Sequence, residues 1–311
     1  MREREVIARL RRMATAPEAR GLLDDVALLD GLVLTHDSIA EGVHFLPFDP
    51  PASVGWKLVA VNLSDLAAKG ATPRAALLSL TIGGDGEWED RFLNGIDAAC
   101  EAYGLALIGG DTISLPPGAP RVLGLTAIGT APSHVPARSG GKPGDALWLV
   151  GTLGDSAGGL AQLLEDRRAH GPLVDIYRRP IPQIEAGRAL APHSHAMMDV
   201  SDGLLLDALR MAEASGCSAR IVLDSLPLSE AFVEARGDAL AERLFAASAG
   251  DDYALLAALP EGLDPRTLEL PAGTLLARIG ALRQGPPAIA ATMAGELVDL
   301  PASLGFEHHA G

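Results

Sequence analysis

The sequence predicts an α/β (α+β) protein of two domains. Its 311 residues exceed the usual size of a single hydrophobic core. In the first half, apolar strand-like runs alternate with amphipathic helical segments, and the pattern restarts after a stretch rich in proline and glycine from Pro132 to Gly144. Such a stretch is typical of an interdomain connection. We therefore predict one domain over residues 1–138 and a second over residues 139–311.

The first predicted element of the sheet is a β-hairpin. Two apolar runs flank Asp-Gly at residues 30–31, a dipeptide suited to a two-residue type I′ turn because both positions need positive φ. This turn pairs Leu29 with Leu32, and counting outward sets Asp24 opposite Asp37. Like charges facing each other destabilise a sheet unless a cation lies between them. For this pair alone, a cation site and two solvated loop acids both remain open.

A helix is predicted next, over residues 53–69. Apolar side chains recur on one face, and Gly70 ends the helix. Asn62, Asp65 and Lys69 form a polar stripe away from that face. An i, i+4 surface pair between Asp65 and Lys69 is the simplest structural explanation of the last two.

The remaining elements follow from apolar runs and helical periodicity. The first domain continues with a strand over 75–82, a helix from about residue 87 to residue 103, and strands over 105–108 and 122–130. The second domain begins with a strand over 146–150 and a helix from about residue 155, and a strand over 196–200 leads into another helix.

The charge balance argues against two classes of partner. Lys and Arg together number 25 against 40 Asp and Glu, which gives a net charge of −15. This excess disfavours nucleic acid and anionic membranes as partners. If the ligand is itself a phosphate, a metal ion must bridge the two negative parties.

We expect a cytoplasmic enzyme. No apolar run approaches the roughly 18 residues that a membrane span needs, and the start at Met1–Glu5 lacks the apolar segment of a signal peptide. Cys100 and Cys217 are isolated, which indicates neither a disulfide framework nor a zinc site. Both are expected to be small buried residues in a reducing compartment.

Acidic residues mark the expected site. Aspartates recur at the ends of apolar runs, at positions 24, 25, 37, 65, 111, 199 and 202. Unpaired acids crowded together would repel one another, so a shared divalent-metal site explains them most simply. Gly-Gly-Asp-Thr at 109–112 follows a short predicted strand, and its glycines would let a phosphate approach the backbone. The same tetrapeptide is also an ordinary turn.

A strand end, two acids and a helix start coincide in Asp199-Val-Ser201-Asp202-Gly. Ser201 or Asp202 could cap the helix, but capping does not explain Asp199. Free amides at a helix N-terminus attract phosphate, and acids on either side can hold the accompanying Mg²⁺. Arg138 could contact phosphate oxygens or be a generic linker arginine, and a lone histidine such as His44 is more often structural than catalytic.

The sequence lacks the commoner motifs for phosphate binding and for nucleophilic catalysis. It contains no Walker A sequence, no set of protein-kinase motifs and no Gly-x-Ser-x-Gly elbow. The residues alone thus predict a Mg²⁺-dependent enzyme acting on phosphates, without naming its substrate.

Taken together, the motifs resemble those of the thiamine-monophosphate kinase family, in the superfamily that includes aminoimidazole ribonucleotide synthetase. They run in the family order from residue 24 to residue 253 and comprise the first Asp-Asp pair, Glu41-Gly-Val-His-Phe-Leu-Pro, the run from Trp56 to Pro73, Gly109-Gly-Asp-Thr, Arg138-Ser-Gly, Gly151-Thr-Leu-Gly-Asp-Ser-Ala, Asp199-Val-Ser-Asp-Gly-Leu and Gly250-Asp-Asp-Tyr. The resemblance implies transfer of the γ-phosphoryl group of ATP to thiamine monophosphate. It also implies a synthetase-like homodimer whose N-terminal mixed sheets join into a barrel beside the nucleotide site, with an α/β sandwich as the C-terminal domain.

The resemblance assigns a role to each candidate residue. Several Mg²⁺ ions are expected on Asp25, Thr35, Asp37, Asp65, Asp111, Asp199 and Asp202. ATP is expected to contact Gly110, Asp111, Arg138 and Ser201, and thiamine monophosphate to contact His44 and Asp251. The expected catalytic residues are Asp199 and Asp202.

The sequence departs from the family pattern at four places. Leu23 stands where glycine is usual, and His36 stands where a hydroxyl residue is usual. Asp251 replaces a longer glutamate that meets the substrate. A C-terminal aromatic ring that packs on thiamine is expected to be missing, since Ser303 falls near its place and Phe306 is the only aromatic residue in that part of the chain.

Two other functions stay open. One is another ATP-using enzyme of the superfamily with a different acceptor, such as a selenophosphate synthetase or the hydrogenase-maturation dehydratase. The first needs a reactive Cys or selenocysteine near the N-terminus and the second a C-terminal Cys, and this sequence has neither. The other is a catalytically silent module that binds nucleotide without turning over an acceptor.

Overall fold

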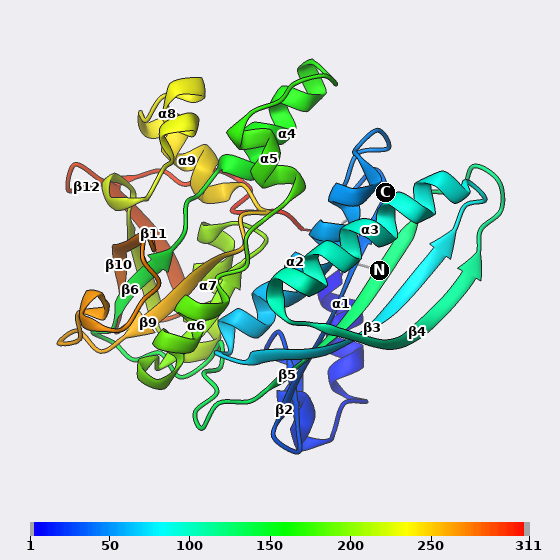
Figure 1. Cartoon of the computed structure of the whole chain (residues 1–311). Helices are drawn as coiled ribbons and strands as arrows, with labels where there is room; N and C mark the ends of the chain where they lie inside the picture. Colours follow the sequence, from blue (N-terminus) through cyan, green and yellow to red (C-terminus); the bar gives the residue numbers. More distant parts are fainter. Residues whose placement is uncertain (1–2, 308–311) are drawn as a thin grey trace.

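Two mixed β-sheets and the helices packed on them form the protein, as the computed structural model shows for residues 3–307 (Figure 1). Each sheet lies in one half of the chain, so the prediction of a two-domain α/β protein is confirmed. The predicted domain ranges also include residues 1–2 and 308–311, which lie outside the described residues.

The first sheet has the strand order β1-β2-β5-β3-β4, in which only β3 and β4 are parallel neighbours. Its strands are β1 (Ala27–Leu29), β2 (Leu32–Ala40), β3 (Thr72–Ile82), β4 (Ala106–Ser114) and β5 (Val122–Thr130). Its helices are α1 (Glu3–Arg11), the 3₁₀ helix η1 (Pro17–Leu22), α2 (Pro51–Ala68) and α3 (Gly86–Tyr103). Helix α2 lies against β2 and β5, and α3 packs alongside α2 (Figure 1). The two helices meet backbone to backbone, because a Cβ at Gly95 would lie 2.0 Å from the carbonyl oxygen of Ala52.

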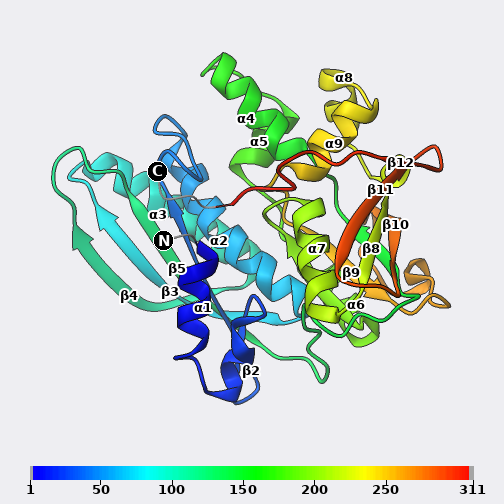
Figure 2. The same cartoon turned by 180° about the vertical axis from the view of Figure 1, so that it is seen from behind.

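The second sheet has the order β12-β11-β8-β10-β6-β9-β7. Its strands are β6 (Ala146–Val150), β7 (Ala196–Val200), β8 (Ser218–Val222), β9 (Ala254–Leu259), β10 (Leu276–Arg283), β11 (Ala288–Met293) and β12 (Glu296–Val298). The helices of this half are α4 (Asp155–Glu165), α5 (Pro172–Arg178), α6 (Ile184–Leu190), α7 (Leu204–Ser215), α8 (Glu230–Arg236), α9 (Leu240–Ser248) and the 3₁₀ helices η2 (Ala191–His193), η3 (Leu223–Ser225) and η4 (Pro265–Thr267). One face of the sheet packs on α7 and α9, and the segment after β12, red in Figure 2, runs back towards the first domain.

Helix α2 lies in the centre of the molecule, between the first sheet and strands β6, β7 and β9 of the second. The apolar face of this helix was predicted, but the polar stripe does not face solvent. Asn62 and Lys69 are fully buried, and Asp65 is 7% exposed. Lys69 does not pair with Asp65; its Nζ instead lies 2.6 Å from Oδ1 of Asp24, so the surface-pair interpretation is wrong. The second domain covers the polar face of α2, which helical periodicity alone predicts to be exposed to solvent.

The predicted hairpin forms with the predicted register. Leu29 pairs with Leu32, and the turn residues Asp30 and Gly31 have φ values of 49° and 78°. The β1–β2 ladder stops at the pair formed by residues 27 and 34. The chain bends away before that point, so Asp24 does not face Asp37 across the hairpin.

Most other predicted elements have the expected type and place, but β4 is longer than the predicted strand 105–108. The glycine pair at 109–110 was interpreted as a phosphate loop after this strand, whereas it lies inside β4 and pairs with β3. Gly110 has a φ of 152°, and a Cβ on it would lie 1.9 Å from the carbonyl oxygen of Leu78. The close approach of two strands therefore requires this glycine.

Both cysteines, Cys100 and Cys217, are buried free thiols, as the sequence indicated. Among residues 3–307, no helix combines the length and the apolar character needed to cross a bilayer.

Candidate active site

Three aspartates from distant parts of the chain converge in the interior. Asp25 precedes β1, Asp65 lies on α2 and Asp199 lies at the end of β7. Each offers a carboxylate oxygen within 4.8 Å of the other two. The Thr35 hydroxyl donates to the Asp65 carboxylate, and the Ser64 hydroxyl donates to Oδ2 of Asp199 over 2.8 Å. Both domains thus contribute to one buried acidic cluster.

Asp37, Asp65 and Asp199 hold their protons more tightly than acids in water do. Burial raises the pKa of Asp65 well above its usual value, and the charges of Asp37 and Asp199 add to the effect. Burial, followed by the charge of Asp25, likewise raises the pKa of Asp199. Burial together with the charges of Asp25 and Asp202 raises the pKa of Asp37 to about 6. A cation placed among these groups would relieve their mutual repulsion.

Asp25 differs because two cations contact it. Burial alone would raise its pKa, but the charges of Arg138 and Lys69 outweigh burial and hold the pKa well below its usual range. Arg138 forms an ion pair with Oδ1, and the Lys69 ammonium lies 3.2 Å from Oδ2. Lys69 is fully buried and also donates to the Met197 carbonyl over 3.1 Å. The cluster therefore contains a permanent internal cation beside its acids.

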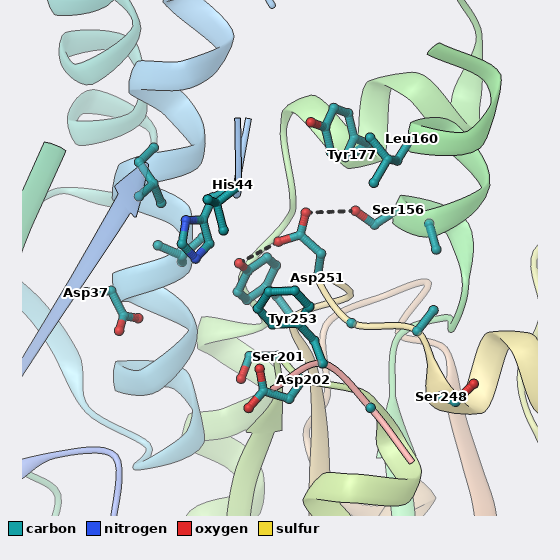
Figure 3. Close-up of a pocket in the computed structure, with 18 of the residues that line it drawn as sticks. Asp37, His44, Ser156, Leu160, Tyr177, Ser201, Asp202, Ser248, Asp251 and Tyr253 are labelled. Atoms are coloured by element: carbon teal, nitrogen blue, oxygen red, sulfur yellow. Dashed lines mark hydrogen bonds between the residues drawn. The ribbon is translucent and has the colours of Figure 1, made fainter. Parts of the chain in front are cut away.

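A cavity of about 500 Å³ opens beside the cluster. Figure 3 shows Asp37 and Asp202 at one end of this cavity, Leu160 and Tyr177 at the other, and Asp251 between them. The cavity therefore has an acidic end and an end walled by an aliphatic side chain and an aromatic ring.

The loop after β7 supplies Ser201 and Asp202 to the acidic end. Neither residue caps the following helix, because the N-cap of α7 is Gly203 and no side chain bonds there. Asp202 instead forms an ion pair with Arg210, which also lies 3.0 Å from Asp207. The capping explanation for these residues is therefore wrong, and both side chains line the cavity.

His44 and Asp251 both line the cavity. Nδ1 of His44 accepts a hydrogen bond from the Ala40 amide over 3.0 Å, which fixes the ring. The Asp251 carboxylate accepts from the Tyr253 hydroxyl over 2.7 Å and from the Ser156 hydroxyl over 3.3 Å. The two residues expected to meet the acceptor thus lie in one cavity.

The aromatic ring that was expected to be missing from the C-terminal segment is present. Phe306 lines the cavity, and its amide donates to the Asp202 carbonyl over 2.8 Å. Gly305 permits this approach, because a Cβ there would lie 2.4 Å from the same carbonyl oxygen. The segment that follows β12 returns to the first domain, a path that sequence spacing does not reveal.

Gly110 and Asp111 do not line the cavity. Asp37 pairs with Leu125, Leu125 with Leu78, and Leu78 with Gly110, so three strand spacings separate Asp37 from Gly110. At the usual spacing between strands this separation is about 14 Å. Both residues lie on the exposed edge strand β4.

The chain matches known proteins over most of its length. Models of AIR synthase related protein match residues 23–131 with the N-terminal domain and residues 142–270 with the C-terminal domain. The sequence is 37% identical over 318 residues to thiamine-monophosphate kinase of Caulobacter vibrioides, which covers 97% of this chain and 89% of that protein. The chain belongs to the thiamine-monophosphate kinase family.

Further relatives agree with this membership. Thiamine-monophosphate kinase of Salmonella typhimurium is 40% identical over 268 residues, covering 82% of this chain and 80% of that protein. The solved structure of AaThiL complexed with AMPPCP and TMP superposes with a TM-score of 0.85 at 29% identity, over 99% of this chain and 97% of that one. The resemblance drawn from the motifs is thus confirmed.

Two lysines within the family motif from Trp56 to Pro73 were not predicted to belong to the site. Lys57 and Lys69 are both buried on or just after α2, and both contact acids of the cavity or the cluster. The sequence contains a pattern that could have identified these two lysines. Only three of the 25 cationic side chains are lysines, and two of those three lie in one apolar helical segment. Asp207 was missed too; burial and the Asp202 charge raise its pKa to about 7.

Proposed function

We propose that this chain transfers the γ-phosphoryl group of ATP to thiamine monophosphate, giving thiamine diphosphate and ADP. The observation that carries the proposal is the single cavity with an acidic end for phosphates and a ring-walled end for a heterocycle, in a chain of the thiamine-monophosphate kinase family. A solved relative binds AMPPCP, an analogue of ATP, together with TMP.

The donor set fits Mg²⁺. Carboxylates and a hydroxyl are oxygen ligands, which hard cations such as Mg²⁺ prefer. Three carboxylates converge within 4.8 Å, and a bound cation would offset the repulsion between Asp65 and Asp199 that helps to raise the pKa of Asp65. In the proposal, several Mg²⁺ ions are held by Asp25, Thr35, Asp37, Asp65, Asp199 and Asp202. Asp111 is contributed by the second chain of a homodimer. Bound there, Mg²⁺ would neutralise phosphate charge and orient the two substrates.

The protein's own groups position the reactants. The acceptor phosphate has a second pKa of about 6 and is largely ionised at neutral pH, so no strong general base is required. The main difficulty is to hold two polyanions in line. In the proposal Arg138 and Ser201 contact ATP, Asp199 and Asp202 act at the reacting phosphates, and His44 and Asp251 face the acceptor. Arg210 restrains Asp202, and Ser64 restrains Asp199, so neither carboxylate turns freely.

We further propose a homodimer in which the two N-terminal sheets join into a barrel. The edge strand β4 is exposed along its whole length and carries the apolar side chains Leu107, Ile108 and Ile113. An exposed apolar edge strand favours pairing with another chain. Gly110 and Asp111 of one chain would then reach the nucleotide and metal of its partner. Ile108→Glu should yield monomers in light scattering and lose activity, and an unchanged dimer would contradict this arrangement.

The domain division belongs to the same proposal. Residues 1–138 would form the ATP-binding and dimerisation domain, and residues 139–311 the C-terminal α/β sandwich. A cytoplasmic location also remains a prediction.

The deciding experiment incubates the protein with ATP, Mg²⁺ and thiamine monophosphate and measures thiamine diphosphate by chromatography. Formation of the diphosphate together with equimolar ADP supports the proposal. Release of ADP without the diphosphate would indicate a different acceptor, and binding of ATP without turnover would indicate a silent module. Either of these results would overturn the proposed function.

A further inference from the structure

Lys57 lies behind the cavity wall and contacts three of the residues that form it. Its side chain is 2% exposed. The ammonium pairs with the Asp251 carboxylate, donates to the His44 carbonyl over 2.9 Å, and lies 4.3 Å from the centre of the Tyr177 ring. Asp251, His44 and Tyr177 all line the cavity, whereas Lys57 does not. A single buried cation thus supports much of the wall around the acceptor end.

The sequence retains a lysine here against its own strong bias. Only three of the 25 cationic residues are lysines, at positions 57, 69 and 142. An ammonium is a compact point charge with three donors, whereas a guanidinium is planar and larger. A site that surrounds the charge with a carboxylate, a carbonyl and a ring face fits the ammonium, so position 57 depends on the side-chain type and not on charge alone.

Asp251 is held in one orientation. Its backbone has a φ of 74°, a left-handed conformation, and its amide donates to the Ser201 carbonyl over 2.7 Å. Oδ1 accepts from Tyr253, and Oδ2 accepts from Lys57 and Ser156, as Figure 3 shows for Tyr253 and Ser156. The carboxylate is 27% exposed on the cavity side, so it can still accept a hydrogen bond from a ligand.

Asp251 has acidic surroundings that make its cation partner important. Its neighbour Asp252 is half-buried, and desolvation raises the pKa of that carboxyl well above its usual value. Asp49 lies behind Tyr177 and accepts from the tyrosine hydroxyl over 3.2 Å. Removing one partner from a buried ion pair leaves the other uncompensated, and an uncompensated carboxylate relaxes by protonation or by turning towards water.

We propose that Lys57 is a positioning residue that fixes the Asp251 carboxylate and the Tyr177 ring for recognition of the heterocyclic part of the acceptor. The inference rests on the proposed function and adds a specificity role within the same cavity. With the acceptor phosphate at the acidic end, the rings extend past Asp251 towards Leu160 and Tyr177. The amino group of the pyrimidine ring is the uncharged N–H donor that thiamine monophosphate carries, and the ordered carboxylate accepts from it.

Kinetics of matched lysine variants test the proposal. Lys57→Met should raise KM for thiamine monophosphate at least tenfold, with KM for ATP changed less than twofold and kcat changed less than KM. The preference for thiamine monophosphate over oxythiamine monophosphate, which has an oxo group in place of the amino group, should fall at least tenfold. Lys142→Met removes an exposed lysine in the interdomain connection. This control variant should change neither the KM for thiamine monophosphate nor the preference over oxythiamine monophosphate.

The outcomes separate this inference from the proposed function. If the wild-type protein makes no thiamine diphosphate, the function fails and the inference fails with it. If the wild type is active but Lys57→Met keeps its acceptor KM and its preference, the inference alone is overturned. A loss of kcat with both KM values unchanged would also overturn it, because that pattern indicates a purely structural role.

A second measurement follows ligand binding by the wild-type protein and needs variants only to assign its signals. Three lysines give three ¹³Cε signals in a lysine-labelled NMR spectrum, assigned from variants at the three positions. Thiamine monophosphate should shift the Lys57 signal in the absence of nucleotide, AMPPCP alone should leave it in place, and the Lys142 signal should respond to neither. An unmoved Lys57 signal at saturating acceptor would overturn the proposal.

Discussion

Replacing Lys69 should make the stability of the protein depend on Mg²⁺. The Lys69 ammonium lies 2.6 Å from Asp24 and 3.2 Å from Asp25, donates to the Met197 carbonyl, and is fully buried. Removing one partner of a buried ion pair costs about 3–5 kcal/mol of unfolding free energy. Arg138 remains beside Asp25, so the low end of that range applies to Lys69→Met.

The assay is thermal unfolding with EDTA and across a Mg²⁺ titration. For a chain of 311 residues, with about 2.1 cal/mol/K of unfolding entropy per residue, a loss of about 3 kcal/mol corresponds to a fall in Tm of about 5 °C in EDTA. The vacated space lets Mg²⁺ bind the acids without competition from an ammonium, and each tenfold gain in Mg²⁺ affinity recovers about 1.4 kcal/mol. The difference in Tm between Lys69→Met and the wild type should therefore become smaller as Mg²⁺ is added.

Lys142→Met is the matched control, because this exposed lysine lies outside the cluster and its loss should change stability by no more than about 0.5 kcal/mol. The reasoning is refuted if Lys69→Met is as stable as the wild type in EDTA. It is also refuted if the difference in Tm stays constant at every Mg²⁺ concentration, since the lysine would then not share the acids with the metal.

Three further predictions concern the cavity. Asp202→Asn should lower kcat by about 100-fold, because it deletes charge where metal and phosphate meet; circular dichroism should show an unchanged fold, and near-normal turnover would contradict the metal assignment. Phe306→Ala should raise the acceptor KM by about tenfold through loss of ring contact, with KM for ATP as the internal control; an unchanged acceptor KM would exclude the ring from recognition. The metal-free protein should lose stability as pH rises, because the folded-state pKa values of Asp37 and Asp207, about 6 and about 7, exceed the unfolded value of 3.8. Between those pKa values the folded state holds protons that the unfolded chain has released, so the free energy of unfolding falls as pH rises. Urea unfolding in EDTA from pH 4.5 to pH 7.5 measures this change. A rise in the free energy of unfolding over that range would contradict the prediction.

Local sequence signals predicted the local structure well. The Asp30-Gly31 turn gave the register of the first hairpin, and the predicted strands 122–130, 146–150 and 196–200 have the bounds of β5, β6 and β7. In each case the information lies within a few residues, in a turn dipeptide or in an apolar run between breakers.

Features that depend on distant contacts were not predictable in the same way. Periodicity identifies one apolar face of α2, but only the second sheet makes the opposite face part of the interior. That cover turns Lys69 from an expected surface residue into a buried cation. The glycine pair at 109–110 was interpreted as a loop because glycine is uncommon within strands, whereas a tight approach to β3 requires it.

In the candidate site, too, the sequence predicted some residues and not others. The identities of the acids were predicted from their places at element ends, and the structure brings Asp25, Asp65 and Asp199 together. Their cationic partners were not predicted, because the ion pairs of Lys57 and Lys69 join positions up to 194 residues apart. Motifs thus indicated the chemistry, while only the fold revealed the groups that hold it in place.

Anomalous diffraction from crystals grown with Mn²⁺ and AMPPCP tests the central claim most directly, since Mn²⁺ takes oxygen ligands as Mg²⁺ does. The account predicts anomalous peaks among Asp25, Asp65 and Asp199, with further peaks towards Asp37 and Asp202 beside the nucleotide phosphates. Ordered nucleotide with no peak at these acids, or peaks confined to other carboxylates, would contradict it.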